Sequence, residues 1–340
     1  MNIFLIHHRS SHHAANSGYG RLVDYLDAQV IYGNSKLPYR LAKSISKLHS
    51  QDAGTYNSSS VLKSIELYQV LKKHTKEDNI VHFLNGERDI RHLNFFKKRF
   101  PKTKFCATFH KPPEILEQIF PDTAELRKLD GAIAVGANQV TFLKEWLQME
   151  NVSYIPHGVD TNFFIPNYSI RAKNNLLFVG QHLRDFDMLN KTLPKIASAI
   201  DDLLVNVIVH PAYSNKIEPQ SYISVFSSVN DEALRHHYQK ATILYLPMLD
   251  STACNSILEA LACGLPIVSS LVGGNSEYLQ GTTNILVGKG TEGNFEMETI
   301  SLLGDQNRLK EIGRSSRLKA NDFEWTNLVL KINAFYTSIV

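Results

Sequence analysis

The chain has 340 residues, which exceeds what one hydrophobic core usually supports, so two domains are expected. Lys and Arg exceed Asp and Glu by only 36 − 33 = 3, a surplus too small to indicate a nucleic-acid partner. No stretch approaches the roughly 20 apolar residues needed to cross a bilayer, and the three cysteines lack paired spacing. These features favour a globular protein of a reducing cytoplasm.

In the first half, short apolar strand patterns alternate with helical patterns. Strands are predicted at 2–6, 28–33, 79–84, 104–110, 131–136 and 152–158, with helices at 60–74, 91–99 and 138–148. This alternation is typical of a parallel sheet covered by helices on both faces. Residues 159–174 show little periodicity, so a domain boundary is expected after His157.

The second half repeats the alternation. Strands are predicted at 175–181, 203–210, 241–247, 265–271 and 283–289, and helices at 186–199, 231–239, 256–263 and 294–312. Residues 323–340 predict an amphipathic terminal helix with Trp325 near its start. Two doubly wound domains follow, each with ligands expected at the carboxyl ends of its strands.

A glycine-containing loop follows the first predicted strand. Gly18 and Gly20 lie in SGYGRL (17–22), where glycines let the backbone approach a ligand closely. No third glycine completes a dinucleotide-binding fingerprint, which counts against an NAD enzyme. Four histidines precede the loop without a Cys or carboxylate at partner spacing, so they favour a cleft lining over a metal site: His7, His8, His12 and His13.

Two further features of the first half each allow two interpretations. His110 ends a predicted strand and points into a cleft, unless it is a structural histidine. Residues 88–104 are basic and hold three phenylalanines, so they could lie on an anionic membrane. Alternatively, the phenylalanines face the core and the lysines face water.

The strongest constellation is the segment 250–277. A strand ends at Pro247 and a helix begins near Asn255, and such a helix start offers unpaired N–H groups and a positive dipole end for phosphate. Glu259 lies one turn inside the helix, where it could accept both hydroxyls of a ribose or merely solvate the helix. Gly273–Gly274 predicts a tight loop over the same crevice.

This segment resembles the donor-site signature of glycosyltransferase family four, whose members adopt the GT-B fold. The matching positions are Glu259, Ala260, Ala262, Cys263, Gly264, Pro266, Gly273, Gly274 and Glu277. The resemblance implies that Glu259 holds the ribose, with Asn255, Ser256 and Ile257 at the donor. The family's first Glu, which contacts the transferred sugar, falls on Ser251, and Asp250 could reach the sugar instead.

The resemblance extends along most of the chain. PHGVDTNFF (156–164) is similar to the family's linker, with His157 in place of the usual Asn. In FVGQHLRDFDML (178–189), Arg184 is the candidate to grip the donor diphosphate, because a guanidinium matches phosphate geometry; a helix-flanking surface charge is the alternative. The resemblance also implies a donor contact for Gly18 and Gly20, and a place near the transferred sugar for His110.

The fold implied is α/β GT-B, with two Rossmann-like domains facing a central cleft. Residues 1–157 would bind the acceptor, 158–324 the nucleotide sugar, and 325–340 would pack back on the first domain. The implied activity is a retaining, metal-independent transfer from a UDP or GDP sugar to a glycan, lipid-linked or other acceptor. Polysaccharide biosynthesis in the cytoplasm, with membrane contact through 88–104, would be a fitting setting. The alternatives are a sugar-nucleotide 2-epimerase and a non-catalytic nucleotide-sugar-binding or scaffold protein.

Overall fold

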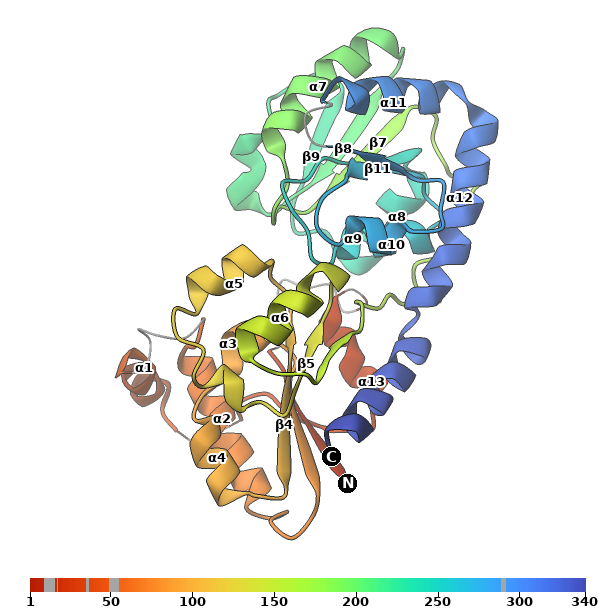
Figure 1. Ribbon diagram of the computed structural model, residues 1–340. Coiled ribbons are helices and arrows are strands. Elements are labelled where there is room, and N and C mark those ends of the chain that lie inside the picture. Colours follow the sequence, from red (N-terminus) through yellow and green to blue (C-terminus); the bar gives the residue numbers. More distant parts are fainter. Residues whose placement is uncertain (9–15, 17, 35–36, 49–54, 289–291) are drawn as a thin grey trace. The chain divides into compact units, whose positions relative to one another are not determined.

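The computed structural model describes residues 1–8, 16, 18–34, 37–48, 55–288 and 292–340 (Figure 1). The chain divides into two compact units. Unit 1 holds residues 1–11, 19–156 and 326–340, and unit 2 holds residues 12–18 and 157–325. The division therefore falls one residue before the predicted boundary, and Gly18, expected in the first domain, belongs to unit 2.

Unit 1 contains a six-stranded, all-parallel sheet in the order β2-β1-β3-β4-β5-β6. Its strands are β1 (Asn2–Ile6), β2 (Gln29–Ile31), β3 (Asn79–Phe83), β4 (Thr103–Phe109), β5 (Gly131–Ala134) and β6 (Val152–Tyr154). The chain leaves β1 towards β2 and then crosses back to β3. The strand order thus reverses between β1 and β3, the place where ligands bind in such sheets.

Alternation along the central strands of unit 1 separates two faces. Val81 and Phe83 of β3 join the core cluster under the helices that follow the strands, whereas His82 points to the opposite face. There its Nδ1 lies 2.7 Å from the Tyr336 hydroxyl, and its Nε2 lies 2.8 Å from Thr108 Oγ1. The terminal helix is therefore fixed to this face by a buried hydrogen bond as well as apolar packing.

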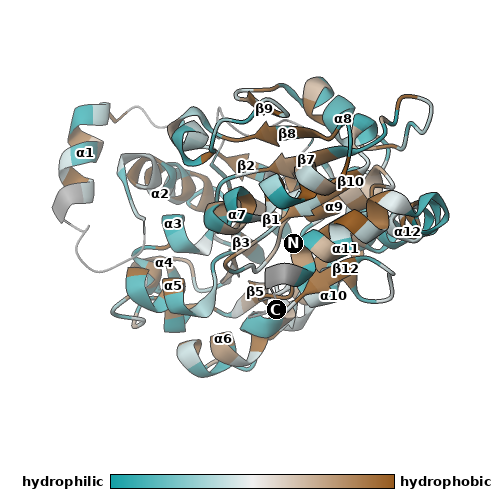
Figure 2. Cartoon of the chain, turned by 90° about the horizontal axis from the view of Figure 1, so that it is seen from above, coloured by the Kyte–Doolittle hydropathy of each residue, from teal (hydrophilic) through white to brown (hydrophobic). Residues whose placement is uncertain are grey.

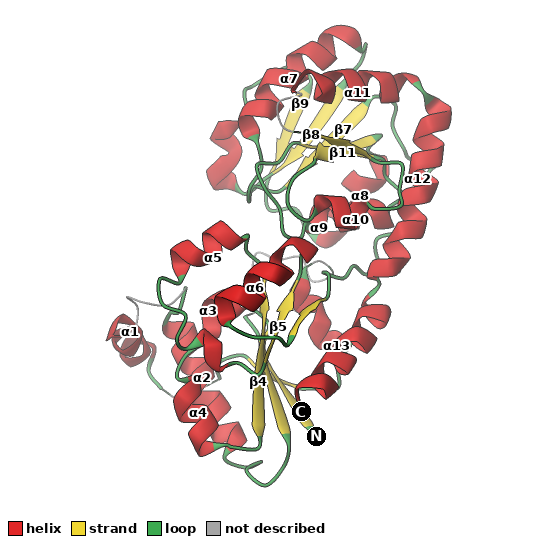
Figure 3. Cartoon of the chain, viewed as in Figure 1, coloured by secondary structure: helices red, strands yellow, loops and turns green. Residues whose placement is uncertain are grey.

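The helices of unit 1 lie on both faces of its sheet (Figure 3). They are α1 (Tyr39–Leu48), α2 (Ser58–Leu71), α3 (Gly86–Asp89), α4 (Leu93–Arg99), α5 (Pro113–Ile119), α6 (Val140–Leu147) and α13 (Trp325–Ile339). An added Cβ at Gly131 would lie 2.7 Å from the Ile339 side chain, so α13 packs closely against β5.

Unit 2 contains a second parallel sheet in the order β12-β11-β10-β7-β8-β9. Its strands are β7 (Asn175–Val179), β8 (Leu204–Ile208), β9 (Ile223–Phe226), β10 (Ile243–Leu246), β11 (Ile267–Ser270) and β12 (Ile285–Val287). Read from β9, the strand order is 3-2-1-4-5-6, that of the dinucleotide-binding Rossmann fold. The switch point lies between β7 and β10.

The helices of unit 2 are α7 (Phe186–Ala199), α8 (Asp231–Lys240), α9 (Asn255–Ala262), α10 (Asn275–Leu279), α11 (Glu292–Gly304) and α12 (Gln306–Ala320). The central strands β7, β10 and β11 are entirely buried, and Figure 2 shows β7 and β8 as hydrophobic ribbons. The prediction of two doubly wound parallel sheets is thus confirmed. Among the described residues, no helix is long and apolar enough to cross a membrane.

Candidate functional site

Two loops meet at the switch point of unit 2. The first follows β7 and includes Gly180 and Leu183, both with positive φ (+93° and +55°). The second follows β10 and begins at Pro247. They pair through hydrogen bonds from the Asp185 N–H to the Pro247 carbonyl (3.0 Å) and from the Leu249 N–H to the Leu183 carbonyl (2.9 Å). The carboxyl ends of β7 and β10 are thereby joined into one surface.

The N-terminus of α9 opens on this surface. Cys254 stands at the N-cap position without a side-chain cap. The amides of the first two helical residues, Asn255 and Ser256, have no acceptor within the part of the chain that the structure describes. Unpaired N–H groups and the positive end of the helix dipole make this an anion-binding arrangement.

The opposite end of α9 is held by two arginines. Arg317 of α12 donates to the Ala262 carbonyl at 2.8 Å. Arg171 donates to the carbonyls of Cys263 (3.1 Å) and Gly264 (2.9 Å). These bonds satisfy carbonyls that a helix end leaves unpaired and place positive charge at the negative end of the dipole.

Arg184 lies at this surface, but its guanidinium is buried and occupied. Its Nε donates to the Val179 carbonyl (2.9 Å), and Nη1 donates to the His182 carbonyl (3.1 Å) and contacts the Met248 sulfur at 3.8 Å. Its Nη2 donates to Cys254 Sγ (3.4 Å) and Ser256 Oγ (3.2 Å). All five N–H groups thus have partners. The alternative of an exposed surface charge is wrong, because only 9% of Arg184 is exposed. The predicted diphosphate contact stays a prediction and would require exchange of one of these bonds.

Glu259 and Tyr238 form a buried pair beneath the helix start. The Tyr238 hydroxyl donates to Glu259 Oε2 at 2.7 Å. Burial, followed by the charge of Glu259, raises the pKa of Tyr238, so its hydroxyl keeps its proton. Glu259 is only 4% exposed, which excludes the interpretation of a helix-solvating carboxylate. The ribose contact stays a prediction.

Ser251, at the position of the family's first Glu, is buried, and its Oγ has no hydrogen-bond partner in the described structure. The neighbouring Asp250 Oδ1 accepts the Ser251 N–H at 2.7 Å, so this carboxylate is oriented by the loop itself. The Gly274 N–H donates to the Ser251 carbonyl at 2.8 Å. The predicted Gly273–Gly274 loop therefore packs directly on residues 250–251.

His157 is a site residue that was noted in the sequence only as a replacement for the usual Asn of the linker motif. Its Nδ1 lies 2.9 Å from Asn255 Oδ1, at the start of α9. Gly18, which belongs to unit 2, has φ +85°, and an added Cβ there would lie 3.3 Å from Asn255 Nδ2. His157, Asn255 and Gly18 are thus brought together. The weak signal for His157 was its place in the linker motif, where the resembling family carries an amide.

A separate cluster lies at the carboxyl ends of β3 and β4 in unit 1. His110 Nε2 lies 2.7 Å from the Leu84 carbonyl, and the ring contacts Tyr19 edge-on at 4.9 Å between centroids. Burial lowers the pKa of His110 to about 4, so the ring is neutral near pH 7. Glu87, which the sequence did not single out, accepts the backbone N–H groups of His110 and Lys111 with one carboxylate oxygen.

Gly20 lies beside His7 in unit 1, since an added Cβ would come within 2.7 Å of the imidazole. His12 and His13 lie outside the described residues. Within those residues, no group of three or more His, Cys, Asp or Glu side chains is arranged for a metal ion.

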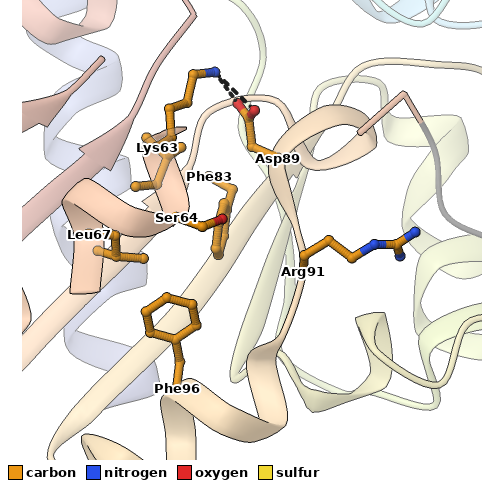
Figure 4. A pocket seen from close by; sticks show the side chains of 8 residues that line it. Lys63, Ser64, Leu67, Phe83, Asp89, Arg91 and Phe96 are labelled. Atoms are coloured by element: carbon orange, nitrogen blue, oxygen red, sulfur yellow. Dashed lines mark hydrogen bonds and ion pairs between the residues drawn. The ribbon is translucent and has the colours of Figure 1, made fainter. Parts of the chain in front are cut away.

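A small pocket lies at the ends of β1 and β3, and Figure 4 shows its lining. Lys63 and Asp89, both buried, face each other there. Lys63 Nζ donates to both Asp89 oxygens, at 2.9 and 2.8 Å. Burial lowers the pKa of Lys63, and the Asp89 charge opposes this shift. The pair fixes α2 to the C-terminal end of α3.

The basic segment 88–104 follows the core-facing interpretation. Leu93, Phe96 and Phe100 are buried in the unit 1 core, whereas Phe95 is 53% exposed. Lys97 donates to Asp130 at 2.9 Å. Membrane contact through this segment stays a prediction. Of its three phenylalanines, only Phe95 is exposed enough to contact lipid.

Residues 173–305 match the family described as glycosyl transferases group 1. The matched segment lies within unit 2. A D-inositol 3-phosphate glycosyltransferase from Arthrobacter sp. is 26% identical over 232 residues, covering 60% of this chain and 55% of that protein. The chain thus spans about half the length of the curated relatives it matches.

Solved structures show the same GT-B fold. Sucrose-phosphate synthase from Thermosynechococcus elongatus has a TM-score of 0.71 at 14% identity, covering 99% of this chain and 98% of its own. HepE from Anabaena, solved in complex with UDP and glucose, has a TM-score of 0.68 at 12% identity, covering 99% and 100%. The predicted GT-B fold and the family resemblance are confirmed.

The matched residues contain Arg184 and the whole segment from Asp250 to Glu277. His157 and Gly18 lie outside the matched residues, although they contact the start of α9 within unit 2.

Proposed function

We propose that this protein is a retaining, metal-independent glycosyltransferase that uses a nucleotide-diphosphate sugar. The observation that carries the proposal is the uncapped N-terminus of α9 at the β7–β10 switch point of unit 2, where residues 173–305 match glycosyl transferases group 1. A diphosphate placed there would meet the unpaired amides of Asn255 and Ser256. The base and ribose would lie towards the strand ends, with Glu259 as the ribose acceptor.

The chemistry proposed is replacement of the sugar–phosphate bond by a bond from an acceptor hydroxyl on the same face of the sugar. The proton of that hydroxyl passes to the departing diphosphate, so no protein nucleophile is required. Donors preorganised around the leaving group stabilise the charge that develops on it. Ser251 and Asp250 would border the transferred sugar, and His110 would lie on the acceptor side as a neutral hydrogen-bonding group.

The acceptor proposed is a glycan or a lipid-linked sugar, with polysaccharide assembly in the cytoplasm and membrane contact through 88–104 as its setting. The UDP and glucose bound to HepE, a protein of the same fold, support a nucleotide-sugar donor. A sugar-nucleotide 2-epimerase and a non-catalytic binding protein are the competing functions. Acceptor-free conversion of the sugar would identify the former, and binding without hydrolysis or transfer the latter.

The test is binding and turnover of UDP, GDP, ADP and CMP sugars with and without EDTA. Glu259→Gln keeps an oxygen for Tyr238 but removes the carboxylate, and Glu311→Ala, on the exposed face of α12, is the control. We expect one base class to bind and release nucleotide, EDTA to have no effect, and Glu259→Gln alone to weaken binding. Failure of every nucleotide to bind the wild type would overturn the proposal. Loss of activity in EDTA would overturn metal independence.

A further inference from the structure

We propose that His157 is a positioning residue that orients the Asn255 side-chain amide to donate to the diphosphate of the donor. The inference rests on the proposed function and deepens it, since it assigns a recognition role to two side chains outside the usual basic residues. It begins from the contact between His157 Nδ1 and Asn255 Oδ1 at 2.9 Å. A carbonyl oxygen only accepts hydrogen bonds, so His157 Nδ1 carries the hydrogen.

His157 is held rigidly enough to impose this orientation. It is 8% exposed, and its backbone N–H donates to the Tyr278 hydroxyl at 2.9 Å. The next residue, Gly158, lies against the Trp325 indole, where an added Cβ would come within 2.3 Å of the ring. Tyr278 in turn stacks on Phe323 at 5.2 Å between centroids. The backbone that carries the imidazole is therefore held from two sides.

With Oδ1 bound to His157, the Asn255 amide nitrogen is turned the other way. No residue in the described part of the chain accepts a hydrogen bond from Nδ2. Nδ2 faces Gly18, which has no side chain. A Cβ added at Gly18 would lie 3.3 Å from Asn255 Nδ2. The side-chain amide thus adds two N–H donors to the unpaired backbone amides at the start of α9.

The commitment of Arg184 gives this amide its importance. Every N–H group of that guanidinium is already bonded to the protein. The backbone amides and the Asn255 side chain are then the donors at this end of α9 that can bind a diphosphate without breaking a hydrogen bond within the protein. The buried, unpartnered Ser251 Oγ on the segment leading into α9 is a second polar group left for a ligand.

The experiment measures binding of UDP, GDP and ADP by calorimetry, and of uridine, guanosine and adenosine by saturation-transfer NMR. The variants are His157→Ala, His157→Asn and Asn255→Asp. Asn307→Asp is the matched control, because it adds the same charge to the exposed first turn of α12 in the same unit. Circular dichroism and thermal unfolding monitor folding of each variant.

For the diphosphate that binds the wild type, we expect His157→Ala and Asn255→Asp to weaken affinity about tenfold or more, since each affects a hydrogen bond to a charged group. Binding of the matching nucleoside should stay unchanged. His157→Asn should restore most of the affinity, because an Asn amide places a donor where Nδ1 stands. Asn307→Asp should bind like the wild type.

Unchanged diphosphate affinity in folded His157→Ala and Asn255→Asp proteins would overturn the inference while leaving the proposed function standing. Equal loss of diphosphate and nucleoside binding would also overturn it, because it would indicate a structural role. If His157→Ala does not fold, Asn255→Asp decides the matter alone. If no diphosphate binds the wild type, the proposed function itself fails.

Discussion

Replacing Gly273 with alanine should distort the candidate donor site. Gly273 has φ +47°, and an added Cβ would lie 1.7 Å from the Ser251 carbonyl oxygen and 2.7 Å from Asp250 Oδ1. A backbone oxygen cannot turn away as a flexible side chain can. Residues 250–251 must therefore shift, and the Gly274 N–H bond to the Ser251 carbonyl must break or lengthen.

The magnitude follows from two contributions. A non-glycine residue in the left-handed region costs about 1–2 kcal/mol. Loss of one buried backbone hydrogen bond costs about 0.5–1.5 kcal/mol. Gly281→Ala separates the two, because Gly281 has φ +80° and nothing lies within 4 Å of an added Cβ. We expect a loss of about 1.5–3.5 kcal/mol for Gly273→Ala and about 1–2 kcal/mol for Gly281→Ala.

The assay is urea denaturation of both variants, with calorimetric titration of the diphosphate that binds the wild type. Gly281→Ala should bind like the wild type. Gly273→Ala should bind about tenfold more weakly, the equivalent of about 1.4 kcal/mol spent on restoring the 250–251 segment. Equal stability losses and equal affinities in the two variants would refute the argument that the Gly273–Gly274 loop shapes the site.

Three further predictions concern buried titratable side chains in unit 1. Asp89→Asn should cost about 3–5 kcal/mol of unfolding free energy in urea denaturation, because it leaves Lys63 buried and unpaired. The double change of Lys63→Met and Asp89→Leu should cost less, and a larger cost for the double change would count against the pair. Burial lowers the pKa of His82 to about 3, so the stability that its neutral form contributes is full above pH 6.5 and is lost as pH falls towards 3. His82→Gln should reduce the loss of stability between pH 6.5 and pH 4, and an unchanged loss would contradict this prediction. Burial raises the pKa of Glu87, so the stability that its protonated form contributes is full below about pH 4.5 and is lost as pH rises through the raised pKa. The difference in Tm between Glu87→Gln and the wild type should therefore favour the variant more at pH 8 than at pH 4. An equal difference at the two pH values would reject this prediction.

The strands were predictable because most of them are continuous apolar runs, which only a sheet covered on both faces produces. The strand missed in unit 2 is β9, where Ser224 and Val225 are exposed and the apolar run is short. The predicted helix 294–312 is two helices. Asp305 caps the second one by accepting the N–H groups of Asn307 and Arg308, a local signal that the apolar periodicity concealed.

The candidate site was predictable only as far as backbone direction determines it. A strand end followed by a helix start gave the anion-binding end of α9, because that geometry is local. The contact of His157 with Asn255 joins residues 98 positions apart, and no periodicity encodes it. Glu87 was not predicted for the same reason. It follows β3, whereas the backbone amides that it accepts, those of His110 and Lys111, follow β4.

The arginines around α9 bind protein atoms at both ends of the helix. A helix of eight residues is only marginally stable by itself, so it depends on tertiary anchors at both ends. Arg171 and Arg317 bind its last carbonyls, and Arg184 ties Cys254 and Ser256 at its start to the end of β7. Arg171, Arg184 and Arg317 thus hold both ends of the helix, and the diphosphate contact of Arg184 stays a prediction. Their charges lie against protein oxygen and sulfur atoms, so the uncapped N–H groups of α9 and the Asn255 side-chain amide are the donors at this surface that have no protein acceptor in the described structure.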